Sequence, residues 1–119
     1  TARALTALLV VDIQHDFLPG GALAVGGGDA ILGPIRELLD SSTFDCVIAT
    51  QDWLPRGPVS FASSHPGRKP FETISLYGRD QVLWPDHCVV GSTGAALHPS
   101  LPLDKVDAII RKGTDPKVD

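Results

Sequence analysis

Three short apolar runs divide the chain, and none of them alternates between apolar and polar residues. They cover residues 7–11, 46–50 and 108–110, and the ionisable residues that follow them are Asp12, Asp52 and Lys112. Continuous runs rich in β-branched residues are typical of strands that are covered on both faces, as in parallel sheets. A buried helical segment can give the same short pattern, but the lengths and the flanking turn residues favour strands. The pattern therefore predicts three parallel strands.

A helix is expected between the first two runs, over residues 29–40. Apolar residues recur there at helical spacing, namely Ile31, Ile35, Leu38 and Leu39. Pro34 fits best near the start of a helix, which leaves the N-terminal boundary open. A strand, a helix and a second strand form a right-handed crossover unit. The next connection, residues 53–105, is rich in Pro, Gly and Ser and only weakly periodic, so we expect it to build a site or a lid.

Composition narrows the class of protein. A chain of 119 residues has room for one domain, and its formal net charge of −4 disfavours a nucleic-acid partner. No apolar run approaches the roughly 20 residues of a membrane span, so no membrane partner is expected. Two cysteines, Cys46 and Cys88, make no disulfide framework. Cys46 lies within an apolar run and is expected to be reduced and buried. We expect a cytoplasmic enzyme or part of one.

The ends of the three runs suggest a site. The carboxyl ends of parallel strands meet at one edge of a sheet, so Asp12, Asp52 and Lys112 should converge. A carboxylate beside an ammonium group can move protons, because each group tunes the pKa of the other. One charged residue after a buried strand ordinarily marks only the point where the chain re-enters water. Three of them, within the motifs that follow, favour a functional site.

Seven motifs occur in order along the chain. They are Val11-Asp12-Ile13-Gln14-His15-Asp16-Phe17, Gly20-Gly21-Ala22-Leu23-Ala24-Val25, Thr50-Gln51-Asp52-Trp53, Ser60-Phe61-Ala62-Ser63-Ser64-His65, Trp84-Pro85-Asp86-His87-Cys88-Val89, Gly94-Ala95-Ala96-Leu97 and Arg111-Lys112-Gly113. This ordered set resembles the nicotinamidase and isochorismatase hydrolase family over essentially the whole chain. The block from Trp84 to Cys88 is typical of nicotinamidases rather than of other amide or isochorismate-type hydrolases of the superfamily.

The resemblance implies an α/β fold whose three-stranded parallel sheet has the order 3-2-1. This sheet would be the N-terminal half of a Rossmann-like, isochorismatase-type hydrolase fold, so residues 1–119 would form the N-terminal part of a single domain that lacks its C-terminal part. The first strand would then be an unpaired edge, with apolar sheet surface left uncovered. Three outcomes are open: a missing half present as a separate segment, a second copy that pairs through the exposed edge, or a marginally stable chain.

The implied activity is that of a cysteine hydrolase converting nicotinamide, a small pyridine carboxamide, to nicotinate and ammonia in NAD salvage. By its motif position, Asp12 would be the catalytic base that activates the thiol, and Lys112 would lower the pKa of that thiol. Phe17 and Trp84 would flank the pyridine ring, although both can also be explained as core residues. Asp52 and His87 match metal ligands, where the metal would hold the pyridine nitrogen.

The sequence departs from the family at the metal site. Nicotinamidases usually carry a histidine two residues after the metal aspartate, and that position is Leu54 here. Asp52 and His87 alone are fewer ligands than the three that a catalytic metal site normally uses. His65 or Ser60 could add a donor. A divalent metal (Zn, Fe or Mn) is therefore expected to bind weakly, and ring binding would depend on Phe17 and Trp84.

The sequence also departs at the nucleophile. The family's cysteine lies well beyond the lysine, in a part that this chain does not reach. Cys88 adjoins His87 but matches a non-nucleophilic position, and neighbouring residues of an extended chain point in opposite directions. Two functions remain open. One is a nicotinamidase whose nucleophilic cysteine is missing from this chain. The other is a non-catalytic, truncated family member that binds a ligand or partner.

Overall fold

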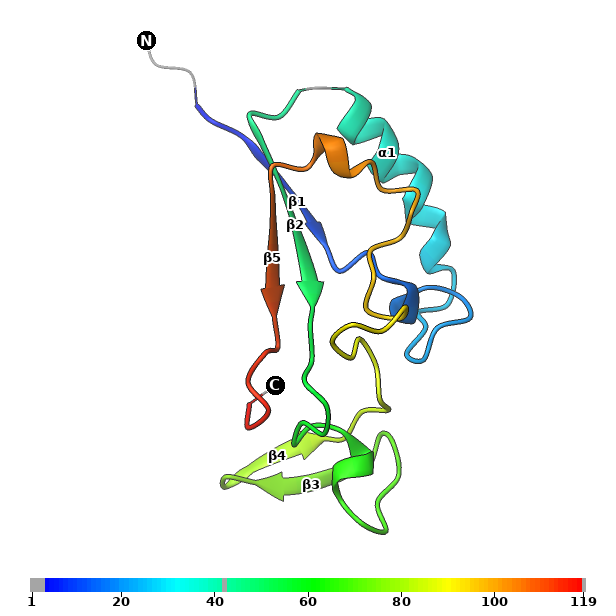
Figure 1. Ribbon diagram of the computed structural model, residues 1–119, viewed down its shortest axis with the longest axis vertical. Helices are drawn as coiled ribbons and strands as arrows, with labels where there is room; N and C mark the ends of the chain where they lie inside the picture. The colour runs from blue at the N-terminus through cyan, green and yellow to red at the C-terminus, as the bar shows by residue number, and fades with distance from the viewer. Residues whose placement is uncertain (1–3, 42, 119) are drawn as a thin grey trace.

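A three-stranded parallel sheet forms the framework of the computed structural model, which describes residues 4–41 and 43–118. Its strands are β1 (Ala7–Val11), β2 (Cys46–Asp52) and β5 (Ala108–Lys112), in the order β1-β2-β5. The sheet has the predicted 3-2-1 order read from its other edge, and all strands point toward the same end (Figure 1). The register pairs Val11 with Thr50, and Asp52 with Lys112.

One helix crosses from β1 to β2. It is preceded by a 3₁₀ turn over Gly28–Ile31 and runs as α1 (Leu32–Asp40). Pro34 lies in the first turn of α1, where a missing N–H costs no hydrogen bond, so the helix begins later than the full 29–40 window. Leu39 packs into the core with Val10, Val47 and Ala49. The apolar stripe of α1 thus covers one face of the sheet.

The long second connection is more ordered than its sequence predicted. It contains a separate antiparallel hairpin of β3 (Thr73–Leu76) and β4 (Arg79–Val82), which sequence analysis missed. The turn residues Tyr77 and Gly78 have φ values of 52° and 74°. Two positive values in succession characterise the tight hairpin turn whose twist matches that of the strands. The hairpin lies beyond the carboxyl ends of β2 and β5 (Figure 1).

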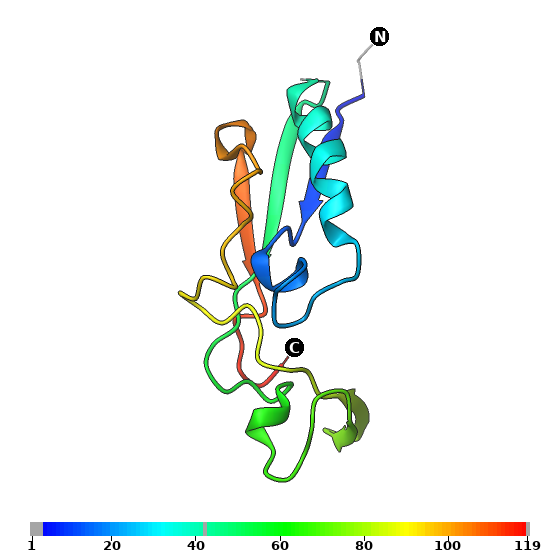
Figure 2. The same ribbon diagram turned by 90° about the vertical axis from the view of Figure 1, so that its right-hand side faces the viewer.

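Only one face of the sheet is covered. Both α1 and the segment that leads into β5 lie on the same side (Figures 1 and 2). On the opposite face Leu9 is 60% exposed, Val11 56% and Ile110 53%, and Cys46 is only half-buried. For the described residues, the cover on both faces that the apolar runs predicted, and a buried Cys46, were therefore wrong. The uncovered apolar surface that the family resemblance implied is present. The apolar side chains on this second face would be buried by further protein, which residues 4–41 and 43–118 do not supply.

The molecule is long for its size. Its radius of gyration is 16.7 Å and its extents are 57 × 34 × 23 Å. A compact domain of this length has a radius of gyration of about 13–14 Å.

Within the described residues, no helix is long and apolar enough to cross a bilayer.

Candidate active site

The three strand-end residues singled out in the sequence lie in contact. The Nζ of Lys112 donates to Oδ2 of Asp12 at 2.8 Å and to Oδ1 of Asp52 at 2.5 Å. The side chains of the two aspartates are 19% and 18% exposed, whereas that of Lys112 is 45% exposed. The parallel register explains the contact, because it brings Asp52 beside Lys112 and ends β1 next to both. One ammonium group therefore bridges two carboxylates at the carboxyl edge of the sheet.

Asp12 stands at a sharp turn of the backbone. Its φ is 56°, a left-handed conformation that aspartate tolerates better than most residues. Its N–H donates to the carbonyl of Thr50 at 3.1 Å, and the Thr50 hydroxyl donates to Oδ1 at 2.7 Å. The neighbouring strand thus holds both the backbone and the carboxylate of Asp12. The second carboxylate oxygen is the one that contacts Lys112.

The site sets the proton affinity of Lys112. Burial tends to lower the pKa of its ammonium group, but hydrogen bonds and charges from Asp12 and Asp52 outweigh this effect and raise the pKa. Lys112 therefore remains a fixed positive charge around neutral pH. A fixed cation beside a carboxylate can stabilise a thiolate or an oxyanion that forms nearby.

Two polar residues that sequence analysis did not single out hold the site together. Gln14 is fully buried, and its side chain bonds to the backbone of Asp52 and of Ala95. Asp16 accepts the N–H of Cys88 at 2.8 Å, and a Cβ at Gly94 would overlap its carboxylate. Both lie in the first motif at alternate positions after Asp12. The polar residues 12, 14 and 16 were a signal that could have revealed this role.

Ring-to-ring contacts involve Phe17, Trp84 and His87, the aromatic residues expected at the site. The ring of His87 lies between Phe17 and Phe61, at centroid distances of 5.6 Å and 5.3 Å. The ring of Trp84 meets that of Phe71 edge to face at 6.1 Å. Phe17 and Trp84 are both half-buried.

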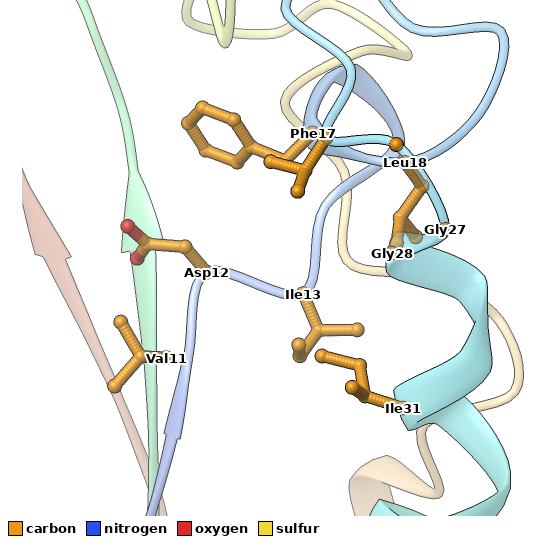
Figure 3. Close-up of a pocket in the computed structure, with 10 residues that line it drawn as sticks. Val11, Asp12, Ile13, Phe17, Leu18, Gly27, Gly28 and Ile31 are labelled. Atoms are coloured by element: carbon orange, nitrogen blue, oxygen red, sulfur yellow. The ribbon is translucent and has the colours of Figure 1, made fainter.

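A pocket of about 470 Å³ opens beside Asp12. Its walls are mainly apolar and include Val11, Phe17, Val25 and Ile31. Figure 3 shows the carboxylate of Asp12 and the ring of Phe17 extending toward the same side, away from Ile13 and Ile31. Asp12 and Phe17 thus share one wall of the pocket, which lies next to the uncovered edge strand β1.

The donors around Asp52 do not fit a metal site with three protein ligands. Leu54 is 1% exposed, and one of its methyl groups lies 2.5 Å from where a Cβ of Gly113 would stand. The same point lies 3.9 Å from Oδ1 of Asp52, and the leucine side chain supplies no metal-ligating atom at this position. Oδ1 itself is bonded to Lys112. Within residues 4–41 and 43–118, no group of three His, Cys, Asp or Glu side chains could hold an ion.

The remaining candidate donors are only partly available. Nδ1 of His87 bonds to the carbonyl of Pro85 at 2.8 Å, which requires a proton on Nδ1 and leaves the lone pair on Nε2. Nε2 of His65 bonds to the carbonyl of Val59 at 2.7 Å. The Ser60 hydroxyl is buried and makes no hydrogen bond to the described residues. One imidazole nitrogen and one hydroxyl are therefore free for a ligand.

Cys88 is a poor nucleophile in this environment. Its side chain is fully buried, and burial raises the pKa of the thiol to about 12, with smaller contributions from the charges of Asp16, Asp52 and Asp12. A thiol must ionise to attack, so these effects work against Cys88. Cys46 lies in β2, at the end of the strand far from Asp52.

Comparison with known proteins places this geometry in a family. The Isochorismatase domain model matches residues 6–115. The nicotinamidase of Acinetobacter baylyi is 50% identical over 95% of this chain, and that of Escherichia coli is 48% identical over 95%. These alignments cover 52% and 54% of the relatives, so the chain spans about half the length of the curated relatives it matches.

Solved structures agree. A nicotinamidase from Acinetobacter baumanii superposes with a TM-score of 0.88 at 48% identity, over 95% of this chain and 54% of that one. A yeast nicotinamidase bound to the inhibitor nicotinaldehyde gives 0.87 at 28% identity, over 95% and 59%. A pyrazinamidase of Pyrococcus horikoshii in complex with zinc gives 0.69 at 36% identity, over 95% and 54%. The chain therefore belongs to the isochorismatase family.

Proposed function

We propose that the protein carrying this chain hydrolyses the amide bond of a small pyridine carboxamide, with nicotinamide converted to nicotinate and ammonia. The contact of Lys112 with both Asp12 and Asp52 is the observation that supports this most directly. It supplies a base and a fixed cation at one edge of the sheet, beside an apolar pocket. Nicotinamidase relatives at 50% and 48% identity support the same choice of substrate.

In this proposal Asp12 takes the proton from a cysteine thiol, and the thiolate attacks the carboxamide carbon. Lys112 stabilises the thiolate and the negative charge that develops on the substrate oxygen. Asp12 then gives its proton to the departing nitrogen, which leaves as ammonia. Water attacks the resulting thioester, with Asp12 again as the base, and releases the carboxylate product. General acid–base catalysis of this kind contributes on the order of 10²–10⁴ in rate.

Phe17 and Trp84 are proposed to flank the pyridine ring. Phe17 lines the pocket next to Asp12, and Trp84 is only partly buried. Because the donors near Asp52 and His87 do not fit a three-ligand site, a divalent metal is proposed to bind weakly. Ring contacts then contribute most of the substrate affinity.

The nucleophile is proposed to lie in the part of the family domain that this chain does not span. Cys88 is buried with a raised thiol pKa, and Cys46 lies inside a strand. The edge of β1 and the exposed side chains of Leu9, Val11 and Ile110 are proposed to receive that second half. Edge pairing and apolar cover are what this surface lacks. A second copy of the chain is the alternative occupant.

A cytoplasmic role in NAD salvage is proposed from the same resemblance. The competing proposal is a non-catalytic module that binds a ligand or partner through the open edge. Leu54, at the position where nicotinamidases usually carry a histidine, favours it, because a leucine cannot ligate a ring-orienting metal.

Ammonia release from nicotinamide tests the proposal. The assay uses the longest polypeptide that contains this chain, with its intact mass measured beside the 12.6 kDa of these 119 residues. Wild-type protein should release ammonia, and Lys112→Met should not do so at a comparable rate. Protein that contains a second half and releases no ammonia would exclude the amidase and leave the binding module.

A further inference from the structure

The side-chain amide of Gln14 joins two segments that are distant in sequence. Its Nε2 donates to the carbonyl oxygens of Asp52 and Ala95, each at 2.8 Å. In return, the N–H of Asp52 donates to Oε1 of Gln14 at 2.9 Å. The residue is 0% exposed, so water cannot replace any of these bonds at low cost.

Gln14 takes the place of a strand next to Asp52. β1 ends at Val11, and the chain turns away at Asp12, so β1 offers no backbone partner to Asp52. The amide of Gln14 carries the same donor and acceptor as a peptide group, and it pairs with both backbone groups of Asp52. On the other side, the N–H of Trp53 donates to the carbonyl of Lys112 at 2.8 Å.

We propose that Gln14 is a positioning residue: its amide fixes the peptide of Asp52 and thereby the carboxylate that Lys112 connects to Asp12. Loss of the amide leaves two backbone groups of Asp52 without partners. These groups turn toward water or rearrange, and the Asp52 carboxylate moves with them. Asp52 then no longer shares Lys112 with Asp12 in a fixed geometry. Gln14 does this without contacting the substrate.

The chain contains a matched control. Gln51 is 5% exposed, and its Nε2 donates to the same carbonyl of Ala95 at 2.8 Å. Its Oε1 accepts from Arg111 at 3.2 Å rather than from the backbone of Asp52. Gln14→Leu and Gln51→Leu therefore each remove a buried amide that bonds to Ala95. Only the first removes partners from Asp52.

Hydrogen exchange of backbone amides, followed by NMR, tests the structural step. In Gln14→Leu, the amide of Asp52 should lose its protection, and the amide of Trp53 should keep it. In Gln51→Leu, both should remain protected. Continued protection of Asp52 in Gln14→Leu, or equal loss at Asp52 and Trp53, would overturn the inference.

Gln14→Asn, which keeps an amide too short to reach both groups of Asp52, replaces Gln14→Leu if that variant does not fold. Unfolding of both variants where Gln51→Leu folds would also overturn it.

The kinetic step rests on the proposed function. Gln14→Leu should lower kcat on the order of 10- to 100-fold while KM changes less than about threefold, because the reacting groups are displaced and the ring contacts are not. Gln51→Leu should change kcat less than about threefold. Equal losses in the two variants, or a loss confined to KM, would refute the positioning role. A wild-type protein that releases no ammonia would refute the proposed function, and the exchange experiment would still decide the inference.

Discussion

The candidate site has two parts that differ in completeness. One is the charged cluster around Lys112, and the other is the expected metal position around Asp52 and Leu54. Around Lys112, every charged group has a partner: Asp12 and Asp52 both bond to its ammonium, and Thr50 bonds to Asp12. At the expected metal position, Leu54 supplies no donor atom, and Oδ1 of Asp52 is already bonded to Lys112. The charged cluster follows from the register of the strands. The metal position depends instead on which residue stands at each loop position. The charged cluster is therefore complete within the described residues, whereas the described donors do not make a three-ligand metal site.

Asp12→Asn should have the largest effect on the charged cluster. The amide keeps the left-handed backbone and the shape of the side chain but cannot accept a proton. In the protein that carries the proposed activity, kcat should fall on the order of 10²–10⁴-fold, with the fold retained by circular dichroism. Asp40→Asn, which changes a carboxylate whose ion pair with Lys105 lies outside the site, is the control. Similar losses in the two variants would show that the charge is needed for folding rather than for proton transfer.

Lys112→Met should have the next largest effect. It leaves Asp12 and Asp52 facing each other without a cation, so kcat should fall by about 10²–10³-fold. Lys105→Met removes a lysine whose ion pair with Asp40 lies outside the site, and it should leave kcat unchanged. If the kcat of Lys112→Met stays within about twofold of the wild-type value, the reaction does not need the positive charge of Lys112.

Leu54→His should complete the expected metal position, which lacks a third donor in the wild type. It would add an imidazole beside Asp52 and His87, which gives roughly the three donors of a catalytic zinc site. Equilibrium dialysis followed by metal analysis should show zinc bound to the variant and little to the wild type. Leu83→His, another fully buried leucine, controls for an added histidine. Strong zinc binding by the wild type would show that the donor set is sufficient without a histidine at position 54.

A charge on the uncovered face should have a smaller effect on this chain. Leu9 is 60% exposed, so Leu9→Lys should change the free energy of unfolding of the isolated chain by less than about 0.5 kcal/mol. It should nevertheless weaken association with a second half or a second copy, measured by sedimentation. Leu5→Lys, at an 82% exposed position before β1, is the comparison. Unchanged association in Leu9→Lys would place the docking surface elsewhere.

The smallest expected effect is on stability at high pH. The pKa of Lys112 is raised in the folded chain, so its charge contributes stability that is fully present below the unfolded value of 10.5. That contribution is lost as pH rises through the raised folded value. Wild type should therefore lose more stability than Lys112→Met between neutral and strongly alkaline pH. Parallel pH curves for the two proteins, measured by thermal unfolding, would contradict the raised pKa.

The sequence predicted the sheet and the meeting of Asp12, Asp52 and Lys112, because continuous apolar runs specify parallel strands and parallel strands end together. It missed the hairpin of β3 and β4, whose residues alternate weakly in burial and pack against no large core. It also missed the role of Gln14. The polar residues at 12, 14 and 16 marked the segment, but the partners of this buried amide are backbone atoms, which a pattern of side chains does not identify. The uncovered sheet face was expected from the resemblance to the family, although the apolar runs themselves indicated burial.

The left-handed turn at Asp12 limits evolution at this position in two ways. The backbone there admits glycine, asparagine, aspartate and few others without strain. Proton transfer to and from a neighbouring group admits aspartate, glutamate and histidine. Aspartate is the residue that satisfies both demands with a side chain short enough to reach Thr50 and Lys112 together. Under the proposed function, a homologue with any other residue at position 12 is therefore expected to lack the hydrolytic reaction while keeping the fold.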